Sequence, residues 1–428
     1  MTGQALARRL GVTDAVVIGL GSMLGAGVFV AFAPAARAAG GTGLLLGLAL
    51  AALVAYCNAT SSARLAARYP ESGGTYVYGR ERLGPWWGFL AGWAFVTGKT
   101  ASCAAMALAI GAYAAPGHAR LVAVAAVVVL TAVNAGGITK TARLTRILVV
   151  VTLGVLALVV VAGLAGGDPS LSRLDDAGPP TVFGVLQAGG LLFFAFAGYA
   201  RIATLGEEVR DPARTIPRAI PLALGIVLAI YAVVALTALA VLGPRRLASA
   251  TAPLADVVAE AGLPALTWVA RAGATVAVTG VLLALIAGIG RTVLAMARRG
   301  DLPRPLSAVA PRQQVPLRAE LAVAAVVIAL VSLGDLRTAI GFSSCTVLVY
   351  YAVTNASALT LGRDPQRRLP VRALAVVGLA GCLLLAVSVP WQSLAAGAAV
   401  LAVGLAGRAV LRRGWRLRAA SAPSRRRP

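Results

Sequence analysis

Apolar residues along this chain gather in stretches of about 20, and short segments rich in Lys and Arg separate them. A helix of about 20 mostly apolar residues crosses the hydrocarbon core of a bilayer, so the pattern predicts twelve membrane-spanning helices. They cover residues 14–37, 42–66, 86–114, 120–138, 146–167, 183–205, 218–242, 265–291, 320–335, 338–361, 373–389 and 391–411. The ninth is short, so the ninth and tenth helices could be divided differently near Asp335.

Small residues interrupt two of these stretches at matching places in the two halves of the chain. The first interruption reads Gly-Ser-Met-Leu-Gly-Ala-Gly over 21–27, and the second reads Phe-Phe-Ala-Phe-Ala-Gly-Tyr over 193–199. Lipid offers no hydrogen-bond partner, so a helix that unwinds there must find other partners for its N–H and C=O groups. Paired broken helices are typical of the binding site of a secondary transporter.

Composition supports an integral membrane protein. Hydrophobic residues make up 59% of the chain and charged residues 13%, against about 45–50% and about 25% in soluble domains. The net charge of +24 does not indicate nucleic-acid binding, because the basic residues lie in short loops and form no single face. The cysteines lack metal-ligand spacing and there is one histidine, so we expect no metal and no cofactor.

The basic residues also predict the orientation. With the N-terminus in the cytoplasm, most of the 39 Lys and Arg residues fall in cytoplasmic loops, as the positive-inside rule requires. We therefore expect a multi-pass protein of a bacterial plasma membrane with both termini cytoplasmic. The Arg-rich tail over 412–428 would lie against anionic lipid. A cleaved secretory signal is the less favoured alternative, because the first apolar run is too long and too rich in glycine.

The first interruption suits a zwitterionic ligand. Glycine permits unwinding, and the N–H groups at the start of the resulting half-helix favour a carboxylate. Carbonyl groups freed on the other side favour an ammonium group, and an α-amino acid carries both charges on neighbouring atoms. A close helix–helix contact through Gly21 and Gly25 is the alternative explanation.

The second interruption is aromatic. Phe194 or Phe196 would be well placed to cover an amphipathic ligand, although packing in the core explains any single phenylalanine.

After the second interruption, Glu207 and Glu208 form either an inner gate with Arg291 or Arg298, or a solvated helix end before a turn.

Lys99 is predicted to lie about midway along the third helix, where an ammonium group costs about 2.5–3.5 kcal/mol on insertion scales. No Asp or Glu lies in the middle of a predicted span. We expect Lys99 to bond freed carbonyls of the first or eighth helix, in the place of a sodium ion, where it could load and release a proton. A purely structural bond in a water-filled cavity is the alternative.

Four segments carry a family resemblance. They read Gly-Ser-Met-Leu-Gly-Ala-Gly-Val-Phe at 21–29, Tyr-Pro-Glu-Ser-Gly-Gly-Thr-Tyr at 69–76, Phe-Phe-Ala-Phe-Ala-Gly at 193–198 with Glu-Glu-Val-Arg-Asp-Pro at 207–212, and Met-Ala-Arg-Arg-Gly-Asp-Leu-Pro at 296–303. In this order they resemble the amino acid–polyamine–organocation superfamily of permeases.

The resemblance implies an all-α membrane fold of five-plus-five helices, with helices 1 and 6 broken and two extra C-terminal helices. The inverted repeats would cover 14–167 and 183–361, followed by the extra helices over 373–411 and the tail, in one transporter domain over 1–428.

The resemblance also implies roles for residues at the breaks. The backbone from Ser22 to Gly27 would hold the substrate's carboxylate, and carbonyls near Phe193 to Phe196 its amino group. Phe194 falls where some relatives place a gating aromatic residue. Relatives often carry a cation-mimicking lysine on helix 5, so Lys99 on helix 3 is a departure. The residues expected to bind substrate are Ser22, Met23, Leu24, Gly25, Ala26, Gly27, Phe193, Phe194, Ala195, Phe196 and Gly198.

The function that these features favour is secondary transport of amino acids, small or neutral, by proton symport or exchange. A polyamine or organic-amine carrier is the alternative, but it calls for acidic residues in the cavity. A membrane-embedded enzyme would need clustered His, Asp or Glu at membrane depth, and a channel would need a continuous polar lining, whereas Ser343, Ser344 and Thr346 are few and local.

Overall fold

The apolar stretches form helices, because a helix pairs its backbone groups within one segment. The computed structural model describes residues 10–69, 73–137, 142–166, 168–203, 209–361 and 368–420. Its α-helices are α1 Val12–Met23, α2 Ala26–Val30, α3 Phe32–Arg68, α4 Thr75–Leu83, α5 Pro85–Ala114, α6 Ala119–Ala135, α7 Ala142–Gly166, α8 Val182–Phe196, α9 Ala200–Ala203, α10 Pro212–Ser249, α11 Pro253–Glu260, α12 Thr267–Arg298, α13 Leu317–Leu333, α14 Leu336–Leu359, α15 Arg368–Ser388 and α16 Trp391–Ala420. Short 3-10 helices are η1 Pro116–His118, η2 Leu171–Asp175, η3 Ala197–Tyr199, η4 Pro264–Leu266 and η5 Arg304–Ser307.

The prediction of a helical membrane protein is confirmed. Within the described ranges, eleven helices are long and apolar enough to cross a membrane. The short ninth span corresponds to α13, which has 17 residues, so the count of twelve stays a prediction. The division near Asp335 falls where we expected it, because the Asp335 carboxylate accepts a hydrogen bond from the Thr338 N–H (3.0 Å) and caps α14.

Two glycines turn the chain where one helical segment ends and another begins. Gly40 has φ 69° within α3, so the residues before it continue the direction of α2 and the residues after it return across the bundle. Gly243 has φ 71° near the end of α10. These left-handed backbone angles favour glycine. Two short helices, α4 and α11, lie outside every predicted span.

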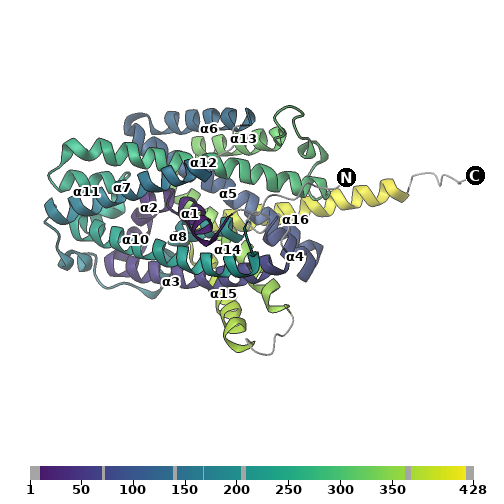
Figure 1. The fold of residues 1–428 in the computed structure, drawn as a ribbon, viewed down its shortest axis with the longest axis horizontal. Helices are drawn as coiled ribbons and strands as arrows, with labels where there is room; N and C mark the ends of the chain where they lie inside the picture. Colours follow the sequence, from purple (N-terminus) through teal and green to yellow (C-terminus); the bar gives the residue numbers. More distant parts are fainter. Residues whose placement is uncertain are drawn as a thin grey trace, which may run out of the picture.

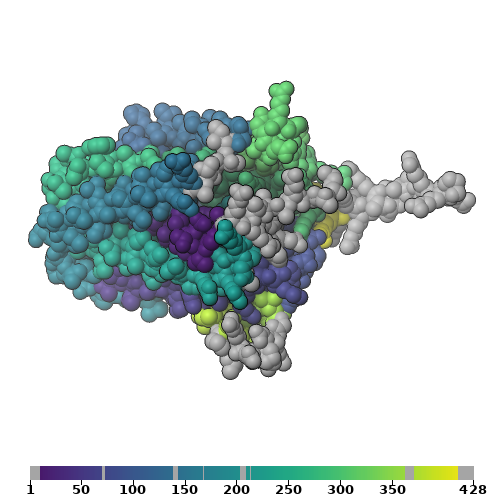
Figure 2. Space-filling model, in the orientation of Figure 1, coloured from purple at the N-terminus to yellow at the C-terminus, as the bar shows by residue number. Residues whose placement is uncertain are grey.

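The long helices run side by side along one direction (Figure 1). Helix α5 packs against α12 and α14, and α3 packs against α8 and α10. In Figure 2, α1 (purple) reaches the surface on the face shown, where it contacts α7 and α10. We call the two ends of the bundle the Asp301 end, where α1 and α10 begin, and the Arg37 end, where α10 ends and α14 begins.

At the Asp301 end, the chain before α1 is joined to the chain before α10. Leu10 and Val209 form an isolated parallel β-bridge, and the Arg210 N–H donates to the Leu10 carbonyl (2.8 Å). The segment that leads into the first broken helix therefore contacts the segment that follows the second one.

Candidate functional site: two helix breaks in contact

The first break is a single tight turn. Leu24 has φ −76° and ψ 60°, and the Gly25 N–H donates to the Met23 carbonyl (2.8 Å). These values describe an inverse γ-turn. Beyond it, α2 starts at Ala26, and the helical bonds from Ala31 to Gly27 and from Ala35 to Ala31 carry the half-helix into α3. The predicted unwinding of this helix at 21–27 is thus present and is centred on Leu24 and Gly25.

The second break changes the helix type. Helix α8 ends at Phe196, η3 occupies Ala197–Tyr199, and α9 continues from Ala200. A short 3-10 segment redirects carbonyl groups away from the α-helical ladder. The second break therefore lies within the predicted segment.

The two breaks touch through their backbones, because glycine leaves no Cβ between them. A Cβ on Gly198 would meet the carbonyl carbon of Ser22 at 2.6 Å, its oxygen closer still, and the Met23 nitrogen at 2.9 Å. A Cβ on Gly27 would likewise meet the Cα of Ala195 at 2.5 Å. The structure therefore brings the two predicted segments together.

Tyr231 of α10 joins both breaks. Its hydroxyl lies 2.6 Å from the Met23 carbonyl oxygen and 3.1 Å from that of Ala195, so one O–H is shared between carbonyls of α1 and α8. The ring is fully buried and packs edge-on against Phe196, with centroids 5.3 Å apart. Sequence reasoning missed Tyr231. The signal was a lone hydroxyl-bearing aromatic residue in the apolar span over 218–242.

We expect Tyr231→Phe to lower the free energy of unfolding by about 1–3 kcal/mol, because buried carbonyls lose their only shared donor while the ring stays in place. Unfolding in mixed micelles would measure this loss. Tyr56→Phe is the matched control, because Tyr56 is 40% exposed, and it should leave stability unchanged. Equal stability of the two variants would contradict the role of the Tyr231 hydroxyl.

Lys99 of α5 reaches the second break. Its ammonium group donates to the Ala197 carbonyl (3.4 Å), which also accepts from the Tyr351 hydroxyl (3.3 Å). The expectation that Lys99 bonds the first or eighth helix is therefore wrong. The change from α to 3-10 geometry at Ala197 turns a carbonyl toward α5 and α14, so the sixth helix supplies the acceptor. Lys99 is 8% exposed.

The phenylalanines at the second break divide into two groups. Phe193 and Phe196 are fully buried and pack edge-on against Tyr351 and Tyr231. Phe194 is 8% exposed. Aromatic packing holds the first two, and a covering role for Phe194 or Phe196 stays a prediction.

Side chains bury most of the two breaks, whereas Ser22 and Gly198 are half-buried. Met23, Leu24, Ala26 and Phe193 are at most 2% exposed. In α2, which follows the first break, the Phe29 carbonyl accepts a hydrogen bond from the Tyr113 hydroxyl of α5 (2.8 Å). The same hydroxyl accepts from the Leu254 N–H of α11 (3.3 Å). Helices α5 and α11 therefore cover the half-helix that follows the first break.

The predicted inner gate stays a prediction. Glu207 and Glu208 lie outside the described residues. Arg291 of α12 is exposed. Beside it, the side chain of Glu320 from α13 is 2% exposed and packs over Gly290. Sequence reasoning missed Glu320, because it stands at the first position of the predicted span over 320–335 and only the middles of the spans were searched for acidic residues.

Two interrupted helices that touch near their middles, within a bundle of apolar helices, are typical of a membrane transporter. The sequence profile of the amino acid permease family matches residues 10–405. The chain belongs to this family and is a multi-pass transporter rather than an enzyme.

Curated relatives agree with this assignment. An uncharacterized transporter of Mycobacterium tuberculosis is 66% identical over 407 residues, which cover 95% of this chain and 92% of the relative. The branched-chain amino acid permease BcaP of Bacillus subtilis is 26% identical over 94% of this chain and 92% of its own. Human cationic amino acid transporter 4 is 28% identical over 83% of this chain and 60% of its own.

Proposed function

We propose that this protein carries small or neutral amino acids across a bacterial plasma membrane by alternating access, with proton symport or exchange as the coupling. The observation that carries the proposal is the backbone contact between the two breaks at Gly198 and Ser22. Two half-helix ends and several carbonyls that accept from side chains then lie in one small region, which matches the adjacent charges of an α-amino acid.

In this proposal the N–H groups at the start of α2 hold the substrate's carboxylate, and carbonyls from Phe193 to Ala197 hold its ammonium group. Phe194 covers the ligand. Among the described residues, the side-chain hydrogen bonds at the breaks come from tyrosine, lysine or serine donors, and none involves a carboxylate. This favours a neutral substrate over a polyamine, although one relative is named a cationic transporter and another a branched-chain permease.

The proposed topology has twelve spans in two inverted five-helix repeats plus two further helices, with both termini cytoplasmic. The Asp301 end would then face the cytoplasm and the Arg37 end the outside. The basic residues concentrated in loops at the Asp301 end support this orientation.

Counterflow in proteoliposomes tests the proposed function. Vesicles are loaded with unlabelled leucine, alanine or lysine, and the uptake of the same labelled compound is measured. We expect leucine or alanine to accumulate and lysine to stay at the level of protein-free vesicles. Accumulation of lysine or of a polyamine alone would overturn the neutral substrate class, and accumulation of no amino acid would overturn the proposal.

We expect Lys99→Met to separate exchange from proton-driven uptake, if the Lys99 ammonium carries the coupled proton. One pH unit is worth about 1.4 kcal/mol and can concentrate a substrate about tenfold. The variant should keep counterflow but show an accumulation ratio of about one under an imposed pH gradient. Thr100→Val is the control, because the Thr100 hydroxyl bonds only the Val96 carbonyl of its own helix (2.7 Å). Loss of counterflow together with driven uptake would instead assign Lys99 a structural role.

A further inference from the structure

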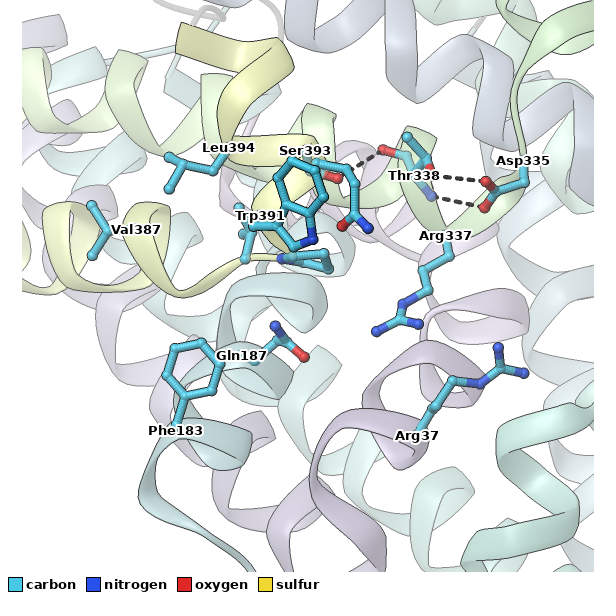
Figure 3. A pocket seen from close by; sticks show the side chains of 13 residues that line it. Arg37, Phe183, Gln187, Asp335, Arg337, Thr338, Val387, Trp391, Ser393 and Leu394 are labelled. Atoms are coloured by element: carbon cyan, nitrogen blue, oxygen red, sulfur yellow. Dashed lines mark hydrogen bonds between the residues drawn. The ribbon is translucent and has the colours of Figure 1, made fainter.

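A cavity of about 690 Å³ opens at the Arg37 end, away from the helix breaks. It is lined by the ends of five helices, namely α3, α8, α14, α15 and α16, together with the short connection between α15 and α16. Figure 3 shows the Arg337 guanidinium extending toward the Gln187 amide, and Arg37 near Arg337 with its guanidinium turned away from Gln187.

The positive charge in this cavity is only partly compensated. Arg37 donates from Nε (3.2 Å) and Nη2 (2.7 Å) to the Ala248 carbonyl at the end of α10. Within the described parts of the chain, Arg337 makes no side-chain ion pair, and its Nε is buried without a hydrogen-bond partner. A buried donor without a partner costs about 1–3 kcal/mol, so an acceptor entering the cavity would recover that loss.

The Asp335 carboxylate in the cavity already accepts hydrogen bonds from its own helix. Asp335 accepts from the Thr338 N–H (3.0 Å) and from the Thr338 hydroxyl (2.7 Å) to cap α14. In Figure 3 it points toward Thr338 and away from Arg37. The Arg37 and Arg337 guanidinium groups therefore both line the cavity, and the Asp335 carboxylate, which attracts Arg337, has its hydrogen bonds taken up by Thr338.

The rim of the cavity is apolar and faces outward. Phe183 is 60% exposed, Val387 59% and Trp391 73%. Large exposed apolar side chains on a membrane-spanning bundle contact lipid, and tryptophan is enriched where acyl chains meet the headgroups. A ligand that fills the cavity thus needs an oxyanion at one end and an apolar body at the other.

We propose that this cavity binds the phosphate of an anionic phospholipid headgroup, with Arg37 and Arg337 as its ligands and the acyl chains running along Phe183 and Trp391. A guanidinium group matches a phosphate through paired, charge-assisted hydrogen bonds. A zwitterionic headgroup fits less well, because it would bring a second positive charge beside the two arginines. The proposal does not depend on the transported substrate.

Native mass spectrometry of the purified full chain, titrated with phosphatidylglycerol in detergent, tests the site. We expect one tightly bound lipid and an affinity reduced about tenfold or more in Arg337→Gln, because a hydrogen bond to a charged group is lost. Arg245→Gln is the matched control. Arg245 lies at the same end, is exposed and does not line the cavity. Phosphatidylcholine should bind more weakly than phosphatidylglycerol.

Two further titrations distinguish a lipid phosphate from a soluble anion. Inorganic phosphate and leucine are titrated against the same three proteins. Arg337-dependent binding of either one, without binding of phosphatidylglycerol, would overturn the lipid in favour of a soluble anion. Equal lipid binding by wild type and Arg337→Gln would overturn the site itself. If that variant does not fold, a photoreactive phosphatidylglycerol on the wild-type protein must crosslink to residues 387–394, and crosslinks elsewhere would overturn the proposal.

Discussion

Gly198→Ala is expected to abolish transport while leaving the protein in the membrane. The new Cβ would collide with the backbone of Ser22 and lie 2.9 Å from the Met23 nitrogen. Backbone atoms cannot rotate away as a flexible side chain can, so the two breaks must separate. Overpacking of this kind costs about 1–3 kcal/mol, which corresponds to a loss of about tenfold to a hundredfold in any step that needs the breaks together.

Initial uptake rates in proteoliposomes, normalised to inserted protein, measure this effect. Gly225→Ala is the matched control, because a Cβ on Gly225 of α10 meets no atom within 4 Å. It should transport as well as the wild type. If Gly198→Ala kept half of the wild-type rate, the breaks would not need to touch during transport.

The second large effect is expected at Asp301, in the cluster of charged residues at the Asp301 end of the bundle. Its buried carboxylate accepts from Arg408 Nε (2.9 Å) and the Tyr76 hydroxyl (2.7 Å), and Arg80 lies at 3.4 Å. The Arg408 side chain is fully buried and stacks over Trp86, with 4.6 Å to the ring centroid. Burial and the hydrogen bond to Asp301 raise the pKa of Tyr76, so the phenol stays a donor at neutral pH.

Asp301→Asn should lower the free energy of unfolding by about 3–5 kcal/mol, because it leaves the Arg408 guanidinium buried without a counter-charge. Adding Arg408→Met should recover most of this loss, since a methionine can fill the apolar space against Trp86 without a charge. Asp168→Asn is the control, because Asp168 is fully exposed in its pair with Arg173, and it should leave stability unchanged. A double variant no more stable than Asp301→Asn would contradict the account. Unfolding in mixed micelles measures all three.

The sequence predicts the helices of this fold well, for a physical reason. A segment in lipid must satisfy its own backbone, so about 20 apolar residues specify a helix with few alternatives. The same rule says nothing about α4 and α11, which are too short and too polar to span. Glycines in the first apolar run predict a break within 21–27, and the structure centres it on Leu24 and Gly25.

What the sequence does not predict is which side chain meets which break. Tyr231 stands about 200 residues from Met23 along the chain, and only the packing of α10 against α1 brings its hydroxyl to that carbonyl. Lys99 shows the same difficulty. Its burial follows from its place in an apolar span, but its acceptor depends on the direction in which one 3-10 turn points a carbonyl.

The pairing of Asp301 with Arg408 has a consequence for how the protein is made. Chains are synthesised from the N-terminus, so the ribosome adds Arg408 107 residues after Asp301. Until α16 enters the membrane, a nascent chain carries a carboxylate whose main counter-charge does not yet exist. Insertion of the last helix therefore completes a polar site that begins near α4, and a chain that stops before Arg408 would leave that carboxylate with Arg80 as its basic partner among the described residues.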